Sequence, residues 1–287
     1  MQITIENLDF TYKLNTPFAM QALENINLSI AEGEFVCLIG PTGSGKSTLI
    51  QQLNGLLLPT NGKIQVEELV IMPNSKRLNA LRRRVGLVFQ YPENQLFEET
   101  IFADIAFGPK NLGLNAAEIE ERVKKAMALV KLDYEKLKNR SPFALSGGQM
   151  RRVAIAGVLA METKILVLDE PIAGLDPLSR NELLSAISEL HEKLGITIIM
   201  ISHSMDDVAK YAQRVIVMDN KRIIMDDSPR EIFKNAEKLL AVGLDVPTMS
   251  KLLWELKKQG WQVKTDCLSL AEAKAEILQA VRRKKNA

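Results

Sequence analysis

Eight consecutive residues have the types and spacing of a phosphate-binding loop. The pattern G-x-x-x-x-G-K-[ST] is matched by Gly40, Pro41, Thr42, Gly43, Ser44, Gly45, Lys46 and Ser47. The glycines let successive backbone N–H groups turn toward phosphate oxygens, and a helix that starts after the loop adds partial positive charge. Lys46 can reach the β- and γ-phosphates of ATP, and the Ser47 hydroxyl can bind Mg²⁺. We therefore predict an ATP site at these residues and at Thr48, where the helical stretch begins.

A second group with catalytic potential is a pair of carboxylates, Asp169 and Glu170, directly after the apolar run 165–168. Ligands of α/β proteins bind at the carboxyl edge of the sheet, so both acids are expected near the phosphates. Asp169 suits Mg²⁺, and Glu170 could polarise a water molecule for attack on the γ-phosphate. Acidic residues commonly end strands as solvated turns, and the pair carries weight only beside the phosphate loop.

The elements that must position these groups follow an α/β pattern. Continuous apolar runs, typical of buried strands, cover residues 34–39, 85–89, 165–168, 196–201 and 215–218. Apolar and polar residues alternate over 3–12 and 22–30, which indicates strands of a mixed or antiparallel sheet. Helical patterns separate the continuous runs, so a core sheet with helices packed on it is expected.

The domain organisation follows from where the helical patterns gather. Residues 112–137 have apolar residues at helical spacing and predict an amphipathic helix. After residue 228 the strand patterns thin out, and helices are expected within 232–240, 247–256 and 268–281. We predict one nucleotide-binding domain over 1–228, with a helical subdomain at about 92–160, and a mainly helical appendage over 229–287 that promotes dimerisation.

Composition narrows the class of protein. The 287 residues are 46% hydrophobic and 25% charged, which fits a folded protein with a sizeable core. A net charge of +2 does not suggest a nucleic-acid binder. Two distant cysteines, Cys37 and Cys267, indicate neither a disulfide framework nor a metal cluster and fit a reducing cytoplasm. No signal peptide is evident, and no apolar run approaches the ~20 residues of a membrane span, so any membrane role is expected through a partner.

Further motifs resemble those of ABC ATPases. The segment Leu145-Ser146-Gly147-Gly148-Gln149 is similar to the ABC signature, and three more family positions are matched by Gln90, Asp176 and His203, in family order. The resemblance implies a P-loop NTPase of the ABC type. Such a protein has a RecA-like core sheet with helices, an antiparallel β subdomain and an α-helical signature subdomain.

The resemblance also implies that one chain forms only half of each ATP site. Two cassettes pair head to tail, so that Ser146, Gly147, Gly148 and Gln149 of one act on the nucleotide held by the other. By the same resemblance, His203 contacts the γ-phosphate, Gln90 senses Mg²⁺ or the attacking water, and Asp176 lies at the dimer seam. Tyr12 could stack on adenine, although a strand tyrosine that merely packs is an equal alternative.

Within the ABC family, the chain resembles the ATPases of energy-coupling factor transporters. The resemblance is carried by residues 91–100, 106–109, 145–177 and 242–248, and residues 16–18 and 95–100 favour the second of the two ATPase subunits. It implies import of vitamins or related micronutrients from the cytoplasmic face of the cell membrane. A sister ATPase, a transmembrane coupling protein docked near residues 90–107 and a separate substrate-binding membrane subunit would be the partners. Ile172 departs from the usual threonine of the family, and we expect little loss of hydrolysis from this substitute.

Several alternatives remain open from the sequence. An ATPase of a cobalt or nickel importer, or one that pairs with itself, is poorly separated from the vitamin importers. A soluble ABC ATPase acting on DNA or ribosomes usually has long coiled-coil insertions or two cassettes in one chain, and this chain has neither pattern. A kinase built on the same phosphate loop would not need residues 145–149.

Overall fold

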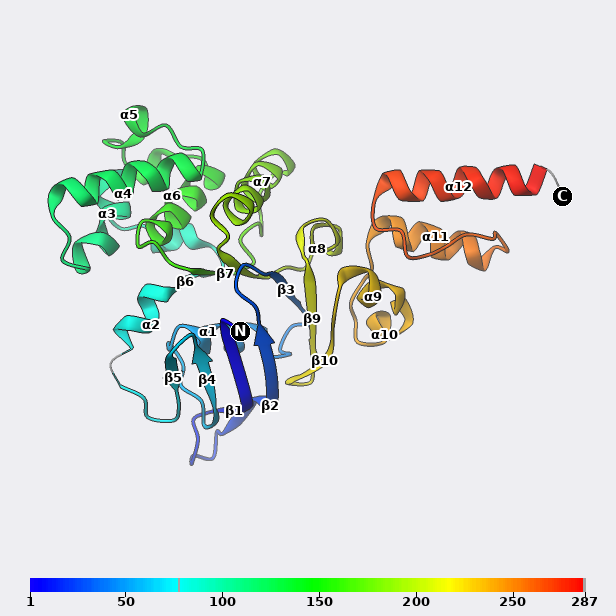
Figure 1. The fold of residues 1–287 in the computed structure, drawn as a ribbon, viewed down its shortest axis with the longest axis horizontal. Helices are drawn as coiled ribbons and strands as arrows, with labels where there is room; N and C mark the ends of the chain where they lie inside the picture. The colour runs from blue at the N-terminus through cyan, green and yellow to red at the C-terminus, as the bar shows by residue number, and fades with distance from the viewer. Residues whose placement is uncertain (77, 286–287) are drawn as a thin grey trace. The chain divides into compact units, whose positions relative to one another are not determined.

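The computed structural model describes residues 1–76 and 78–285, and Figure 1 labels its helices and strands. The chain divides into two compact units. The first unit comprises residues 1–34 and 47–201, and the second comprises residues 35–46 and 202–287. The last two residues of the predicted appendage, 286 and 287, lie outside the described residues.

The first unit contains an antiparallel sheet with the strand order β2-β1-β4-β5. Its strands are β1 (Ile3–Tyr12), β2 (Met20–Ile30), β4 (Asn61–Val66) and β5 (Leu69–Ile71). The two strands predicted from alternation at 3–12 and 22–30 are confirmed as β1 and β2. The short strands β4 and β5 were not predicted, because the alternation over them is brief. They pair as a hairpin whose turn includes Glu67 at a φ of 52°.

Three parallel strands of the first unit carry the candidate catalytic residues at their ends. These strands are β6 (Val85–Val88), β7 (Ile165–Asp169) and β8 (Thr197–Ile201). Every residue of the three is buried, which is why the sequence reads as continuous apolar runs rather than as alternation. Because β6 and β7 are parallel neighbours, their carboxyl ends lie at the same edge, followed by Gln90 and Glu170.

The helices that follow the phosphate loop or belong to the first unit are α1 (Lys46–Leu53), α2 (Asn79–Arg84), η1 (Pro92–Gln95), α3 (Ile101–Asn111), α4 (Ala116–Leu129), α5 (Tyr134–Leu137), η2 (Pro142–Ala144), α6 (Gly147–Leu159) and α7 (Pro177–Leu194). The predicted single helix at 112–137 is instead α4 and α5. Helix α4 starts with a capping box of Asn115 and Glu118, and the chain leaves it through Lys131 at a φ of 58°. Asp133 then caps α5, so local side-chain hydrogen bonds divide the segment.

The second unit begins with β3 (Phe35–Ile39), which pairs in parallel with β9 (Arg214–Asp219). Strand β10 (Arg222–Asp227) is antiparallel to β9, across a turn in which Asn220 and Lys221 both have positive φ angles of 43° and 69°. This turn geometry matches the right-handed twist of a hairpin. The sequence did not predict β10, because its apolar run is short and its turn lacks glycine. Helix α8 (Met205–Tyr211) precedes β9.

The C-terminal part of the second unit has a small core of its own. Its helices are α9 (Pro229–Lys234), α10 (Ala236–Ala241), α11 (Thr248–Lys258) and α12 (Leu270–Lys285). The core residues are Leu253, Val263, Cys267, Ala273 and Ala280. Both cysteines of the chain are buried free thiols. None of the described helices combines the length and apolar character needed to cross a membrane.

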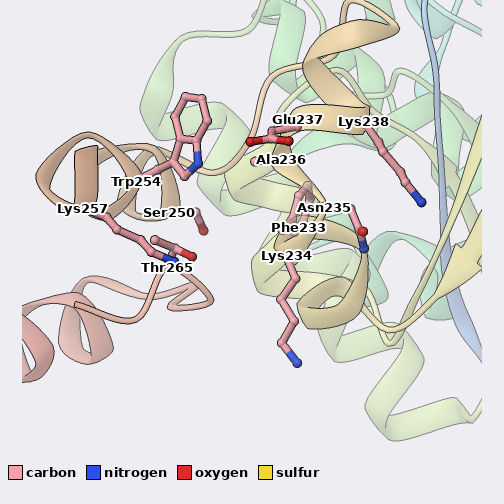
Figure 2. A pocket seen from close by; sticks show the side chains of 10 residues that line it. All are labelled: Phe233, Lys234, Asn235, Ala236, Glu237, Lys238, Ser250, Trp254, Lys257 and Thr265. Atoms are coloured by element: carbon pink, nitrogen blue, oxygen red, sulfur yellow. The ribbon is translucent and has the colours of Figure 1, made fainter. Parts of the chain in front are cut away.

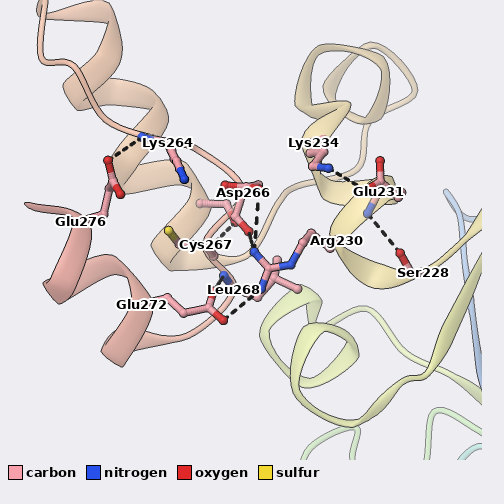
Figure 3. Close-up of polar contacts among 11 residues, drawn as sticks. Ser228, Arg230, Glu231, Lys234, Lys264, Asp266, Cys267, Leu268, Glu272 and Glu276 are labelled. Atoms are coloured by element: carbon pink, nitrogen blue, oxygen red, sulfur yellow. Dashed lines mark hydrogen bonds and ion pairs between the residues drawn. The ribbon is translucent and has the colours of Figure 1, made fainter.

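Arg230 connects α9 to the chain around α12, as Figure 3 shows. Its guanidinium donates to the Asp266 carbonyl oxygen at 2.8 Å and to the Glu272 carboxylate at 2.9 Å. Glu272 also accepts from the Leu268 N–H, and this hydrogen bond is the main cause of its lowered pKa. These polar contacts join α9 to the first turn of α12 and to the segment before it.

Gly86 in β6 provides a test of the packing beneath α6. A Cβ at this position would lie 2.2 Å from Val158 Cγ1 and 3.0 Å from Thr163 Cγ2. Gly86→Ala is therefore expected to lower the free energy of unfolding by about 1–3 kcal/mol through overpacking. Urea unfolding would measure the change.

Gly157→Ala in α6 is the matched control, because its Cβ would lie 3.9 Å from Ile105 Cα and 4.0 Å from the Asp104 carbonyl oxygen, which is ordinary van der Waals contact. It should leave stability unchanged or raise it by about 0.5–1 kcal/mol through helix propensity. Equal stabilities of the two variants would contradict the packing described here.

Candidate nucleotide-binding and hydrolysis site

The phosphate loop lies between β3 and α1 and closes around the side chain of Lys46. The ammonium donates to the carbonyl oxygens of Gly40 at 2.7 Å and Pro41 at 2.8 Å, and to Ser44 Oγ at 3.4 Å. Lys46 and Ser44 are buried, and the Ser44 N–H donates to the Pro41 carbonyl oxygen at 3.2 Å. The loop thus has the strand–turn–helix context in which a backbone cradle and one cation serve phosphate groups.

Gly40 is sterically required at the start of this loop. A Cβ would lie 2.2 Å from the Met218 carbonyl oxygen and 2.7 Å from Ser44 Oγ. Because a backbone oxygen cannot move aside as a flexible side chain could, only glycine fits this close approach. Gly43 has a φ of 81° and open space around it. Glycine is favoured there because other residues rarely adopt this backbone conformation, not because a side chain would clash.

Tyr12 and Thr48, both predicted to bind ATP, contact one another. The Tyr12 hydroxyl lies 3.1 Å from Thr48 Oγ1, and the Tyr12 ring packs edge-on against Phe10 with centroids 4.7 Å apart. The position of Tyr12 is therefore fixed by contacts on two sides. Its suggested stacking on adenine stays a prediction.

Gln90 and Glu170 meet at the ends of β6 and β7. Gln90 Nε2 donates to Glu170 Oε2 at 3.1 Å, although the two residues are 80 positions apart. Asp169 ends β7 with only 6% of its surface exposed, whereas Gln90 is exposed. Glu170, the residue after Asp169, is partly exposed. The buried Asp169 carboxylate could hold a cation, and the Glu170 carboxylate could polarise a water molecule.

The backbone at Glu170 is unusual, with a φ of 48° in the left-handed region. Its N–H donates to the Ile201 carbonyl oxygen and its own carbonyl oxygen accepts from the Ala173 N–H, each at 3.2 Å. A non-glycine residue in this region costs free energy and persists only where surrounding contacts hold it. The turn continues with the Leu175 N–H donating to the Ile172 carbonyl oxygen, so it forms with isoleucine at position 172.

The signature segment forms the exposed amino terminus of α6. Ser146 Oγ accepts from the Gln149 N–H at 3.4 Å, and Gln149 Oε1 accepts from the Ser146 N–H at 3.2 Å, which is a capping box. Gly147 has open space where a Cβ would lie. Gly148 is buried, and its Cβ would lie 2.9 Å from Ser179 Cβ, so glycine allows α6 to approach α7 closely.

Asp176 and His203 occupy exposed positions before helices. Asp176 caps α7 by accepting from the N–H groups of Leu178 and Ser179 at 3.0 Å each. His203 lies in the second unit between β8 and α8, directly before Ser204, which caps α8. The structure therefore gives Asp176 a local structural role in addition to any role at a dimer seam.

The first unit also has an apolar groove of about 180 Å³ beside the Gln90 segment. Two exposed rings, Phe97 and Phe107, contact edge to face with centroids 5.0 Å apart. The groove is lined by Gln95, Leu96, Phe97, Asp104, Phe107, Gly108, Val153, Ala154, Gly157, Val158 and Met161. Asp104 accepts from the N–H groups of Phe97 and Glu98, and burial raises the pKa of its carboxyl group.

The C-terminal part of the second unit has a larger hollow of about 310 Å³. Figure 2 shows the side chains that line it. It is lined by Phe233, Lys234, Asn235, Ala236, Glu237, Lys238, Ser250, Trp254, Lys257 and Thr265. In Figure 2, Lys234 and Lys238 point away from Trp254 rather than toward a common centre. Its described lining residues all lie outside the predicted site.

Sequence analysis did not identify Arg151 and Glu93. Among the residues that the structure describes, Arg151 is the largest fully buried side chain, and it forms an ion pair with Glu93, with Nε 3.0 Å from Glu93 Oε2. The apolar pattern of α6 gave no indication that an arginine would be buried there. An arginine inside an otherwise small and apolar helix, just after the signature, is the signal that could have singled it out.

Comparison with families and relatives gives consistent matches. A family profile described as "ABC transporter" matches residues 23–173. Two relatives are named "Energy-coupling factor transporter ATP-binding protein EcfA2". The one from Clostridium perfringens (strain 13 / Type A) is 55% identical, over 98% of this chain and 99% of the relative. The one from Caldanaerobacter subterraneus subsp. tengcongensis is 53% identical, over 100% of both chains.

Solved structures are similar as well. The structure of cbiO1 from Clostridium perfringens, described as part of the ABC transporter complex cbiONQ, has a TM-score of 0.74 and 40% identity. It is matched over 94% of its length by 84% of this chain. A dimeric ATP-binding cassette in a post-hydrolysis state, bound to ADP and phosphate, has a TM-score of 0.70 and 29% identity. That match covers 79% of this chain and 98% of the cassette.

The cap formed by Asp176 predicts that the stability of α7 depends on pH. Hydrogen bonds from the Ser179 hydroxyl, the Ser179 N–H and the Leu178 N–H lower the pKa of Asp176 below its usual 3.8. Because the folded state favours the carboxylate, its stabilisation is complete above the usual pKa and is lost as pH falls through the lowered value. Thermal unfolding between about pH 7 and pH 2 would follow this loss.

Two variants separate the charge from the cap. Asp176→Asn keeps an oxygen acceptor without a titrating group, so this part of the pH dependence should disappear. Asp176→Ala removes the acceptor and should be less stable than Asp176→Asn at neutral pH. A pH profile of Asp176→Asn that is identical to that of the wild type would show that Asp176 does not contribute.

Proposed function

The chain belongs to the ABC transporter family, among the ATP-binding proteins of energy-coupling factor transporters, and from this premise we propose how its residues bind and hydrolyse ATP. Membership confirms the predicted ABC-type P-loop fold and the predicted ATPase activity. The observation that carries the proposed site is the hydrogen bond between Gln90 and Glu170 at one strand edge, in a chain with a complete phosphate loop.

The phosphate loop is proposed to hold the β- and γ-phosphates of ATP. Lys46, already inside the turn of the loop, contributes the positive charge. Oxygen donors suited to Mg²⁺ are available from the Ser47 hydroxyl, the Gln90 amide and the buried Asp169 carboxylate. When bound, Mg²⁺ neutralises charge that develops on the phosphate oxygens.

Glu170 is proposed as the general base for hydrolysis. Its carboxylate is partly exposed, and the hydrogen bond from Gln90 Nε2 orients it at the strand edge, where a carboxylate could accept a proton from water. The local left-handed backbone is consistent with a residue held in position for chemistry. His203, exposed after β8, is proposed to contact the γ-phosphate.

A second cassette is proposed to complete the ATP site. The exposed amino terminus of α6 at Ser146 and Gly147 offers N–H groups and a partial positive charge to an anion on another chain. Gln149 supports this terminus through the capping box. The dimeric structure of the related cassette is consistent with such pairing. Asp176, exposed at the start of α7, is proposed to lie at the seam.

The membrane role is proposed from the relatives and the apolar groove. The relatives are named for energy-coupling factor transporters, and the groove with Phe97 and Phe107 suits an apolar helix of a transmembrane coupling protein. We place the chain at the cytoplasmic face of the membrane, paired with a sister ATPase through helices of the 229–287 appendage. The imported substrate would be a vitamin or related micronutrient, bound by a separate membrane subunit.

The roles of Glu170 and Lys46 are separable by substitution. In the assembled complex, Glu170→Gln should lower kcat for ATP hydrolysis by about a hundredfold or more and leave ATP affinity intact. Lys46→Ala should weaken ATP binding itself, because it removes the loop's cation. Phosphate release and equilibrium nucleotide binding measure the two effects. Substantial turnover by Glu170→Gln would exclude it as the base.

The groove can be tested without disturbing the nucleotide site. Phe107→Glu puts a charge on the groove wall and should reduce recovery of the membrane coupling protein with the tagged chain by about tenfold, while ATP binding is retained. Phe18→Glu is the matched control, because Phe18 is an exposed phenylalanine between β1 and β2 and outside the groove. Equal recovery with both variants would place the docking surface elsewhere.

A further inference from the structure

The buried guanidinium of Arg151 makes three hydrogen bonds next to the proposed catalytic residues. Only 2% of Arg151 is exposed. Nε and Nη2 donate to the two carboxylate oxygens of Glu93 at 3.0 and 3.2 Å, and Nη1 donates to the Pro171 carbonyl oxygen at 2.9 Å. The planar fork of arginine suits this combination, because it pairs with a carboxylate in bidentate fashion and still has donors in another direction.

The groups bound by Arg151 flank the Gln90–Glu170 hydrogen bond on both sides. Glu93 lies in η1, just after Gln90, and Pro171 directly follows Glu170. The Tyr91 ring lies 5.7 Å from the guanidinium carbon, and Tyr91 has a left-handed φ of 54°. One side chain therefore holds two unusual backbone segments, each adjacent to a proposed catalytic residue.

The same elements form walls of the apolar groove. Helix η1 contributes Glu93 to the ion pair and Gln95 to the groove. Helix α6 contributes Arg151 to the ion pair, and Val153, Ala154 and Gly157 to the groove. Movement of η1 against α6 would therefore displace Glu93 and, through the ion pair, the Arg151 guanidinium. The guanidinium is also hydrogen-bonded to the Pro171 carbonyl oxygen, so the displacement would reach the turn after Glu170.

We propose that Arg151 is a positioning residue that holds Gln90 and Glu170 in their hydrogen-bonded arrangement and connects the groove to them. This inference rests on the proposed function of Glu170 and of the groove. Arg151 itself contacts neither nucleotide nor water in the proposed mechanism. It acts through Pro171 and η1, so its loss should affect turnover more than ATP binding.

A double substitution tests this role without leaving an unpaired buried charge. A buried ion pair can often be replaced by apolar side chains of similar size without unfolding the protein, whereas removal of one partner leaves a buried unpaired charge. Arg151→Met/Glu93→Met should therefore remain folded while the tie to Pro171 is lost. In the assembled complex we expect kcat to fall by about tenfold or more, with ATP affinity near that of the wild type and a thermal midpoint lowered only by loss of the hydrogen bond to the Pro171 carbonyl oxygen.

The matched control is Arg122→Met/Glu162→Met. This pair also joins an arginine and a glutamate, 2.9 Å apart, within the first unit, but its residues belong neither to η1 nor to the Pro171 turn. It should leave kcat unchanged. Arg151→Lys is a second variant that keeps the buried charge beside Glu93 but lacks the fork that also reaches Pro171, and it should show the same selective loss of kcat.

The outcomes distinguish this inference from the proposed function. A folded Arg151→Met/Glu93→Met complex with wild-type kcat, or a fall in kcat fully matched by loss of ATP affinity, would overturn the positioning role. If the double variant does not assemble, Arg151→Lys decides by the same criteria. Hydrolysis that persists in Glu170→Gln would instead overturn the proposed function, whatever the Arg151 variants do.

Discussion

The parallel pairing of β6 with β7 is the constraint on which the rest of the first unit depends. The register Val85 to Ile165 through Val88 to Leu168 fixes both carboxyl ends at one edge, where Gln90 and Glu170 meet. Parallel neighbours cannot be joined by a tight turn, so the chain between them must return to the opposite end of the sheet. The segment that makes this return includes η1, α3, α4, α5 and α6, and it carries both the groove and the signature segment.

That topology explains why the proposed binding surfaces and the proposed catalytic residues lie on the same elements. The strand edge supplies the acids, while the long connection supplies the exposed terminus of α6 and the apolar groove. The connection must nevertheless be held at a fixed position relative to the carboxyl ends of β6 and β7. The ion pair of Arg151 and Glu93 and the hydrogen bond from Arg151 to the Pro171 carbonyl oxygen hold it there. Because these groups are buried, leaving any of them unpaired would be costly, so their positions are tightly constrained.

Features set by local chemistry could be predicted from the sequence. The phosphate loop, the continuous apolar strands and the ABC-type fold depend on short patterns, and the Ser146–Gln149 capping box is equally local. Features set by long-range contacts could not. Strand β10 forms because β9 is beside it, and the burial of Arg151 depends on Glu93, which is 58 positions away. The division of 112–137 into two helices depends on the left-handed backbone conformation of Lys131. Lysine rarely adopts this conformation, so the sequence does not predict it.

If this chain is one ATPase subunit of a membrane importer, affinity purification should recover it together with its membrane partners. A tagged chain would be recovered from detergent-solubilised membranes of its native organism, its companions identified by mass spectrometry and the eluate assayed for ATP hydrolysis. We expect the tagged chain to bring with it a related ATPase and a multispan membrane protein, and the eluate to hydrolyse ATP. Recovery of soluble companions alone, with hydrolysis by a homodimer of this chain, would contradict this expectation.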